Sequence, residues 1–209
     1  MSDIVLYGDP RSPYVRTARM ALAEKGVGYT LKPADLKDAA YRRVHPYARM
    51  PAMEHGALRV FETAAITRYV DEAFEGPALQ PADAGGRARM TQWISAYNDY
   101  MARPFGPKLV IERLAPKIFG RPTNEDEIRG ALPEVERALD VLDAGLSGDP
   151  YLAGATASLA DLFVAPMLFY VGLTPEGQER LPRHRALALW FERMRSRPSF
   201  AATMPELPG

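Results

Sequence analysis

The chain contains no cysteine among its 209 residues. This absence excludes disulfide bonds, zinc–thiolate sites and a cysteine nucleophile together. Histidine is also scarce, and His45, His55 and His184 show no spacing typical of metal ligands. The sequence therefore predicts no metal site.

A net charge is also missing, because 26 Lys and Arg residues balance 26 Asp and Glu residues. Nucleic-acid binding and adsorption to anionic membranes both rely on an excess of positive charge, so neither partner is expected. The first residues, MSDIVLYGDP, lack the basic segment and apolar run of a secretory signal. No stretch approaches the roughly 20 apolar residues of a membrane span. We therefore expect a cytoplasmic protein.

The first third of the chain alternates strand and helix patterns. A short apolar run predicts a strand over residues 4–7, and apolar residues at three- and four-residue spacing predict a helix over 14–25. Residues 29–31 predict a second strand, parallel to the first because a helix separates them. After a loop with one helical turn, residues 52–61 predict a hairpin that turns at 55–57, and residues 63–74 predict another helix.

Strand patterns disappear after residue 86. Amphipathic stripes predict helices over 90–101, ending at Arg103-Pro104, and over 128–142 and 187–194, whereas 159–171 is apolar nearly all round and predicts a buried central helix. Gly and Pro gather between residues 76 and 86, as in an interdomain linker. We therefore expect an α/β domain over residues 1–79, a linker over 80–86 and an all-helical domain over 87–209.

Three short segments at strand ends or helix starts could carry chemistry. Ser12 could donate a hydrogen bond to an anion at a helix start, or it could simply cap that helix. The bond between Met50 and Pro51 could be cis, although trans is the commoner state. Glu62 and Thr63 could bind a ligand, or could only cap the next helix and complement its dipole.

Four segments in order resemble the cytosolic glutathione transferases, and most closely the serine-type members such as the phi class and its bacterial relatives. They are LYGDPRSPYVRTARMALAEKG, HPYARMPA, FETAAITRYVDE and Gly154-x-x-x-Ser158-x-x-Asp161. The resemblance covers nearly the whole chain. It implies a thioredoxin-like glutathione-binding domain followed by an all-helical domain, with Ser158 and Asp161 as a structural capping box in the central helix.

The resemblance also implies a role for each matching residue. Ser12 would hydrogen-bond the sulfur of glutathione, the co-substrate, and hold it as a thiolate that attacks a small electrophile or a peroxide. Met50 before a cis Pro51 would pair its backbone with the cysteine of glutathione. Glu62 and Thr63 would hold the γ-glutamyl group. The glycyl end would lie near Arg49, with Lys37 and Arg42 as further candidates.

An electrophile pocket is implied between Ser12 and the first helix of the second domain, and family members are usually two-fold symmetric homodimers. Most residues of an aromatic helical stripe pack in the core, so only one or two of the candidates are expected to contact substrate. The candidates are Tyr14, Tyr97, Tyr100, Met101 and Phe105.

Other interpretations remain open. A binding or scaffold protein can share the fold without activity, but the retained Ser12, Pro51 and Glu62-Thr63 favour an enzyme. A specialised isomerase or dehalogenase is the other alternative, although Arg11-Ser12-Pro13 lacks the Ser-Ser/Cys pair usual in the isomerases. The cysteine-type oxidoreductases are excluded, because Ser12 stands where their cysteine would be. Tyr7 precedes Gly8 as in serine-type members, where this tyrosine is not the catalytic group.

Overall fold

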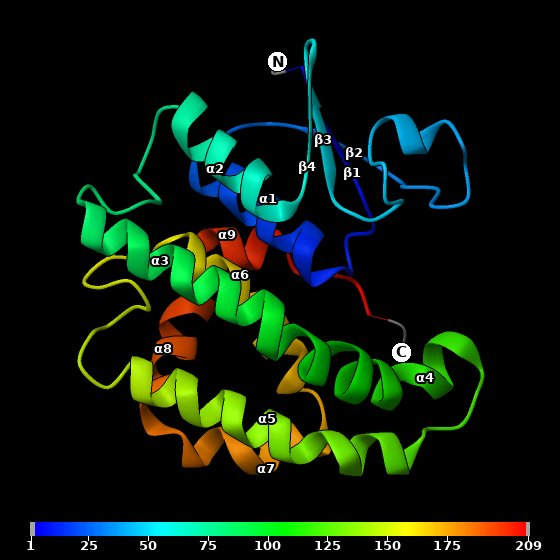
Figure 1. Cartoon of the computed structure of the whole chain (residues 1–209), viewed down its shortest axis with the longest axis vertical. Coiled ribbons are helices and arrows are strands. Elements are labelled where there is room, and N and C mark those ends of the chain that lie inside the picture. Colours follow the sequence, from blue (N-terminus) through cyan, green and yellow to red (C-terminus); the bar gives the residue numbers. More distant parts are fainter. Residues whose placement is uncertain (1–2, 208–209) are drawn as a thin grey trace. The chain divides into compact units, whose positions relative to one another are not determined.

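Contacts divide residues 3–207 of the computed structural model into two units. The first unit extends to Gln80 and also includes Arg197–Glu206, and the second covers Pro81–Ser196 (Figure 1). Two details differ from the expected limits. The first helix of the second unit, α3, begins at Ala84, inside the predicted linker 80–86. Residues 197–206 join the first unit, although the sequence pattern assigned them to the helical domain.

A four-stranded sheet forms the centre of the first unit, in the order β2-β1-β3-β4. Strand β1 is parallel to β2, whereas β1 and β3, and β3 and β4, are antiparallel. The hairpin between β3 and β4 turns at Gly56, whose φ of 57° suits a residue without a side chain. The strands are β1 (Ile4–Tyr7), β2 (Thr30–Lys32), β3 (Ala52–His55) and β4 (Leu58–Phe61). These elements confirm the expected α/β, thioredoxin-like arrangement.

Two helices of the first unit contact each other, α1 (Pro13–Glu24) and α2 (Thr63–Ala73). Helix α1 buries an apolar face that includes Val15, Ala18 and Leu22, because these residues recur at three- and four-residue spacing. The helical turn expected after β2 is the 3₁₀ segment η1 (Tyr41–Arg43). Both helices therefore follow the sequence pattern to within one or two residues.

A charged residue on the buried face of α1 explains why the end of the chain belongs to the first unit. Arg16 is fully buried, and its Nη2 donates to the carbonyl of Phe200 at 3.0 Å while its guanidinium lies 4.0 Å from the centre of the Phe200 ring. Phe200 lies on α9 (Pro198–Ala202). Arg197 also pairs with Glu24 at 2.8 Å. A buried cation needs partners, and residues 197–206 supply them.

The named elements of the second unit in residues 3–207 are all helices, as expected, and turns and loops connect them. Helix α6 is buried along nearly its whole length, which confirms it as the central helix. No single helix in residues 3–207 is long and apolar enough to cross a membrane; Leu159–Val171 and Pro175–Arg183 would pass by length and composition only as a pair bent by 107°. The elements are α3 (Ala84–Ala96), η2 (Tyr97–Met101), η3 (Pro104–Val110), α4 (Ile111–Phe119), α5 (Glu125–Gly145), α6 (Leu159–Val171), α7 (Pro175–Arg180), η4 (Leu181–Arg183) and α8 (Arg185–Arg195).

The predicted helix stop at Arg103-Pro104 is wrong. The helical path continues from α3 to Phe119 through the two π-helical segments η2 and η3. Proline lacks an amide hydrogen and its ring crowds the preceding turn of an α-helix, and a wider π turn accommodates both defects. Pro104 and Pro107 therefore change the local hydrogen bonding without ending the helix.

The start of α6 carries the predicted capping box. The backbone N–H of Ser158 donates to Asp161 Oδ2 at 2.8 Å. The other carboxylate oxygen, Oδ1, accepts from the backbone N–H of Leu152 at 3.0 Å and from Nε1 of Trp190 at 2.7 Å. Complete burial raises the pKa of the Asp161 carboxyl, and its hydrogen-bond donors act in the opposite direction. This one side chain therefore joins α6 to α8 and to the preceding loop.

We expect Asp161→Ala to lower the free energy of unfolding by about 4 kcal/mol, because it leaves three buried N–H groups without an acceptor. Urea denaturation followed by circular dichroism measures the change. The matched control is Asp126→Asn on α5, whose side chain is 88% exposed and whose replacement should cost less than about 0.5 kcal/mol. A loss below about 1 kcal/mol in Asp161→Ala would contradict the structural role.

Candidate functional site

The register of the sheet brings three separate chain segments to one edge. Tyr7, the last residue of β1, pairs with Ala52, the first residue of β3, and Ala52 pairs in turn with Phe61, the last residue of β4. Three segments therefore meet the sheet side by side at this edge. They are the loop that follows β1, the dipeptide that precedes β3 and the junction that follows β4. These are the segments that contain Ser12, Met50-Pro51 and Glu62-Thr63.

The loop between β1 and α1 is held by its own hydrogen bonds. The backbone N–H of Ser12 donates to the carbonyl of Asp9 at 3.0 Å. The Asp9 carboxylate accepts from the backbone and from the guanidinium of Arg11, which keeps the pKa of that carboxyl below its usual value. Gly8 precedes this loop, and a Cβ there would lie 2.3 Å from Val15 Cγ2. A glycine is therefore required where the chain passes close to α1.

Ser12 is the N-cap residue of α1. Its Oγ accepts a hydrogen bond from the backbone N–H of Val15 at 3.4 Å. Its hydroxyl hydrogen has no acceptor among residues 3–207, and the side chain is half-buried. The capping interpretation is thus confirmed, and it uses only a lone pair of Oγ. The O–H group can still donate to a ligand placed before the helix.

The peptide bond between Met50 and Pro51 is cis, as the family resemblance implies. The backbone N–H of Asp9 contacts Met50 Sδ at 3.4 Å, which links this segment to the loop that carries Ser12. On the other side, the hydroxyl of Tyr41 donates to the carbonyl of Arg49 at 2.8 Å. Burial, with a smaller contribution from Tyr7, raises the pKa of Tyr41 to about 12, so this donor keeps its proton at neutral pH.

Glu62 adopts φ 72° and ψ 125°, a conformation that non-glycine residues rarely take. Such a conformation costs on the order of 1–3 kcal/mol and often marks a functional position. The Glu62 side chain does not cap α2, so the first amides of this helix have no side-chain acceptor. Thr63, which begins α2, is 5% exposed, and its hydroxyl makes no hydrogen bond within the described residues. The arrangement leaves open donors at a helix start.

Tyr7 is already engaged with another group. Its hydroxyl donates to Glu54 Oε2 at 2.7 Å, and Arg59 binds the other oxygen of the same carboxylate at 2.8 Å. The hydrogen bond to Glu54 is the main reason why the pKa of Tyr7 is raised. A phenol that donates to a carboxylate has no second proton to give to a thiolate, which agrees with the minor role expected for Tyr7.

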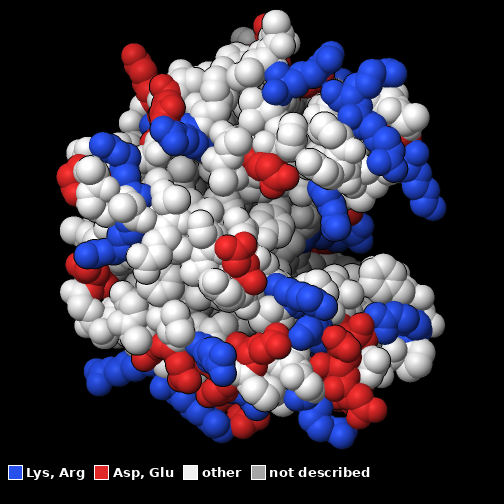
Figure 2. All heavy atoms as spheres, viewed as in Figure 1, with Lys and Arg blue, Asp and Glu red and all other residues white. Residues whose placement is uncertain are grey.

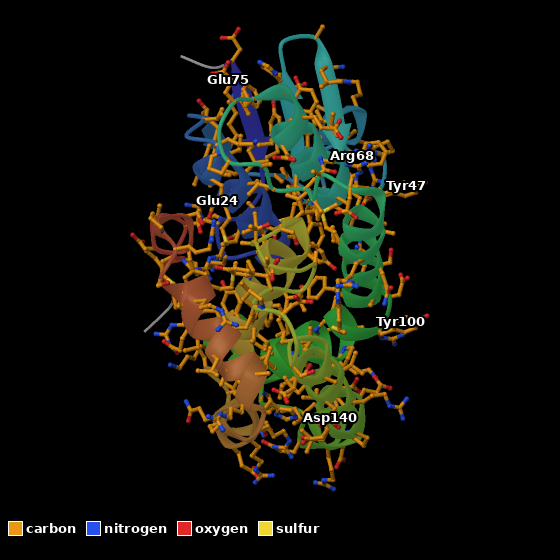
Figure 3. All side chains as sticks on the ribbon, turned by 90° about the vertical axis from the view of Figure 1, so that its left-hand side faces the viewer. Glu24, Tyr47, Arg68, Glu75, Tyr100 and Asp140 are labelled. Atoms are coloured by element: carbon orange, nitrogen blue, oxygen red, sulfur yellow. The ribbon has the colours of Figure 1, made fainter. Side chains whose placement is uncertain are left out.

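The residues expected to line the electrophile pocket differ in how deeply they are buried. Tyr97 and Phe105 are each 1% exposed, and Tyr97 packs edge-on against Phe163, so both belong to the core of the second unit. Tyr100 is 75% exposed and lies at the surface (Figure 3). Together with Met101 it lines a cavity of about 570 Å³ formed by η2, η3 and α5. In the first unit, Tyr14 is half-buried near the start of α1.

Basic side chains gather after β2 in the first unit, as Figure 2 shows for the face in view. Lys37, Arg42, Arg43 and Arg49 are all exposed, and none forms an ion pair with a residue in the 3–207 range. Lys37 and Arg42 were expected near the glycyl end of glutathione, and Arg43 adds a third neighbouring cation. The region can attract a carboxylate.

Sequence reasoning did not identify two buried polar side chains of the first unit, His45 and Arg16. His45 is 1% exposed, and its Nδ1 has no hydrogen-bond partner in the described part of the chain, residues 3–207. Burial is the main cause that lowers its pKa, so the ring is neutral at pH 7. The ring packs against Phe61 with centroids 5.0 Å apart. No local pattern marks His45 or Arg16, because each is buried by segments far away in the sequence.

The comparisons with known proteins agree with this geometry. Residues 6–78 match the model of the glutathione S-transferase N-terminal domain, and residues 125–193 match that of the C-terminal domain. The chain is 31% identical over 210 residues to glutathione S-transferase F9 of Arabidopsis thaliana, covering 95% of each protein. It is 28% identical to glutathione S-transferase 3 of Zea mays, covering 100% of this chain and 96% of the relative.

Solved structures give the same result. The crystal structure of glutathione transferase F7 from Populus trichocarpa superposes with a TM-score of 0.86 at 27% identity, covering 96% of this chain and 97% of that one. A theta class glutathione S-transferase from Xanthomonas axonopodis pv. citri, solved with glutathione bound, gives a TM-score of 0.84 at 27% identity and 97% coverage of both chains. Similarity of sequence and fold over almost the whole length shows that this chain belongs to the glutathione S-transferase family.

Proposed function

We propose that the chain is a glutathione transferase in which Ser12 stabilises the thiolate of bound glutathione. The observation that carries this role is the Ser12 hydroxyl, whose oxygen caps α1 while its hydrogen has no acceptor among residues 3–207. A sulfur placed before α1 would accept that hydrogen bond and would also lie at the positive end of the helix dipole. No base is needed beside Ser12, because its hydroxyl acts as a donor and not as a nucleophile.

The stabilisation of the bound thiolate that this role requires is modest. A free thiol has a pKa near 8.5, so only a few per cent is thiolate at neutral pH. Lowering the pKa of the bound thiol by about two units corresponds to roughly 2.7 kcal/mol of preferential binding of the anion. One charge-assisted hydrogen bond and a helix start together supply an amount of this order. The thiolate would then attack an electrophilic carbon or a peroxide.

The rest of glutathione would be held by the three segments that the sheet register brings together. The backbone of Met50 would pair with the cysteine of glutathione in the manner of an added strand. The open amides of α2 and the hydroxyl of Thr63 would bind the γ-glutamyl carboxylate, and Glu62 would meet its ammonium group. Arg49, with Lys37 and Arg42 as further candidates, would attract the glycyl carboxylate.

We propose that the electrophile binds beside Ser12 and contacts one or two of the candidates named from the sequence. Because Tyr97 and Phe105 lie in the core, they would support the wall of the pocket without contacting the electrophile. Tyr14, Tyr100 and Met101 remain the candidates for direct contact. The chemical identity of the electrophile, and the balance between conjugation and peroxide reduction, depend on this part of the site.

The first prediction for the site concerns its donor. Ser12→Ala should lower turnover of glutathione with a chloronitrobenzene substrate by about 10- to 100-fold near neutral pH, because one pKa unit in the bound thiol changes the thiolate fraction tenfold. The pKa of bound glutathione, followed through the ultraviolet absorbance of the thiolate, should rise in parallel.

A matched control separates catalysis from capping. Asp83→Ala removes the N-cap of α3, where Asp83 accepts from the backbone N–H of Gly86 at 2.9 Å. It should cost about 1 kcal/mol of stability, like the loss of any cap, and leave turnover unchanged. Ser12→Ala with an unaltered thiol pKa would remove Ser12 from the mechanism. Glutathione binding without turnover in the unmodified protein would instead favour the scaffold interpretation.

A second prediction separates binding from chemistry. Thr63→Val keeps the shape of the side chain but removes its hydroxyl, so the KM for glutathione should rise about 10-fold, the effect of losing one hydrogen bond to a charged group. The kcat value should change less than KM. Thr67→Val is the control on the same helix, since the hydroxyl of Thr67 is buried against the carbonyl of Thr63. An equal effect of both substitutions on KM would contradict the binding role of Thr63.

We also propose a homodimer, the assembly usual for this family, in the cytoplasmic location expected from the sequence. Tyr47 in the first unit is 72% exposed, and the surface of the second unit carries Tyr100 and Val141, 75% and 45% exposed, next to the 570 Å³ cavity. Large apolar side chains exposed on both units are suited to contact between two copies of the chain.

Light scattering should give twice the chain mass of 23.1 kDa. Tyr47→Ala should weaken the dimer at least about 10-fold, as expected when an aromatic interface residue is truncated. Leu189→Ala on α8, a residue that is 54% exposed, serves as the control and should leave the dimer intact. A monomer at all concentrations would disprove the dimer, and a dimer unaffected by Tyr47→Ala would disprove this contact surface.

A further inference from the structure

Three side chains that could bind a cation meet in the second unit, outside the proposed glutathione site. Glu136 and Asp140 lie one turn apart on α5, and His184 lies between η4 and α8. One possible ligand atom from each residue lies within 4.8 Å of the other two. His184 Nε2 is 3.1 Å from Asp140 Oδ1 and 3.9 Å from Glu136 Oε1. The sequence spacing hides this cluster, because 44 residues separate His184 from Asp140.

The position of the imidazole determines which nitrogen is available. Nδ1 of His184 lies 2.9 Å from the backbone carbonyl of Arg180. A carbonyl oxygen only accepts, so Nδ1 must carry a hydrogen. In the neutral ring, Nε2 then has its lone pair directed at the two carboxylates. Histidines that bind metals usually donate their other N–H group in this way, often to a backbone carbonyl.

Arg180 also orients the second ligand. Its Nε binds Glu136 Oε2 at 3.0 Å, while the other oxygen, Oε1, is the one closer to His184. The same residue therefore fixes His184 through its backbone carbonyl and Glu136 through its side chain. Hydrogen bonds of this kind orient carboxylate ligands in metal sites as well.

Electrostatics favours a positive occupant between these groups. A neutral Nε2 and two carboxylate oxygens all present lone pairs to the same small region, and such an arrangement is unfavourable unless a proton or a cation lies between them. Two carboxylates and one guanidinium leave a local charge of about −1, which attracts a divalent ion.

We propose that Glu136, Asp140 and His184 bind one divalent transition-metal ion of the zinc type. One imidazole nitrogen and two carboxylate oxygens match the ligands preferred by Zn²⁺ and Co²⁺, and hard cations such as Mg²⁺ prefer oxygen alone. Tetrahedral zinc with bonds of about 2.0–2.1 Å places its ligand atoms about 3.3 Å apart. The separation between His184 Nε2 and Asp140 Oδ1 is 3.1 Å, and the 3.9 Å between His184 Nε2 and Glu136 Oε1 would shorten on binding. Three protein ligands leave the fourth position to water.

The solvent exposure of the three side chains also favours an ion site here. The side chain of Asp140 is 67% exposed and that of Glu136 is 39% exposed, whereas that of His184 is only 7% exposed. A cation can therefore enter from the solvent side, where the exposed Asp140 carboxylate can adjust, and meet an imidazole and a Glu136 carboxylate already held in place by Arg180. The bound ion would join α5 to the start of α8 and stabilise the second unit, independently of glutathione.

The test uses the full chain without an affinity tag, treated with a chelator and then freed of it, and without glutathione, whose thiol itself binds zinc. Titration calorimetry with Zn²⁺ should give one site per chain, and Co²⁺ should produce visible absorption bands typical of a low-coordinate site. Zinc should also raise the thermal unfolding temperature in a concentration-dependent way.

Asp140→Asn should weaken zinc binding at least about 10-fold and remove the zinc-dependent rise in unfolding temperature. Its side chain is 67% exposed and contributes little to folding, and circular dichroism checks the fold. Asp126→Asn, an exposed carboxylate elsewhere on α5, is the matched control and should bind zinc like the unmodified protein. His184→Gln should abolish the Co²⁺ bands.

Three results would overturn the proposal. The first is the absence of zinc binding up to millimolar concentration, which would mean that a proton alone occupies the cluster and that His184 forms an ion pair with Asp140. The second is unchanged affinity in Asp140→Asn, which would locate zinc at another site. The third is equal weakening by Asp140→Asn and Asp126→Asn, which would indicate only general attraction to a negative surface.

Discussion

Backbone pairing between β1, β3 and β4 is the constraint on which the proposed glutathione site depends. Because Tyr7, Ala52 and Phe61 are paired in one line across the sheet, the chain segments that leave or enter these residues share one edge. A shift of one residue in either pairing would move a segment along the strand and turn its side chains to the other face. The site is therefore positioned by main-chain hydrogen bonds of the sheet.

Each segment at this edge is then fixed by a local device. Arg11 and Asp9 hold the loop before α1, Tyr41 holds the carbonyl of Arg49, and Glu62 takes a rare backbone conformation at the start of α2. At the same edge, the hydroxyl hydrogens of Ser12 and Thr63 have no acceptor among residues 3–207. Such preorganised donors suit an anionic tripeptide better than a neutral one.

The helical domain follows a different principle. Its central helix is apolar on nearly every side, so packing alone would allow several orientations. Asp161 removes this freedom, because its carboxylate oxygens accept from the loop before α6, from the start of α6 and from Trp190 of α8. Polar groups buried in this way specify one arrangement. The proposed metal cluster would add a second link, between α5 and α8, at the surface of the same domain.

Local sequence determined most of the elements, because hydrophobic periodicity and turn residues act within a few residues of each position. Strand β1, helix α6 and the capping box of Ser158 and Asp161 follow from such patterns, and so does the position of Ser12 at a helix start. At Pro104 the local rule predicts the end of a helix. The helix continues there, because a π turn accommodates the proline.

Only the tertiary structure decided which distant residues meet. The burial of Arg16 by the segment around Phe200, the packing of His45 against Phe61 and the approach of His184 to Asp140 all join residues that are far apart in the sequence. Chain order therefore determined that a serine lies at the strand-to-helix junction where we propose the thiolate donor. The three-dimensional pairing of strands and helices decided what surrounds that donor, because side-chain contacts depend on distance in space and not on separation along the chain.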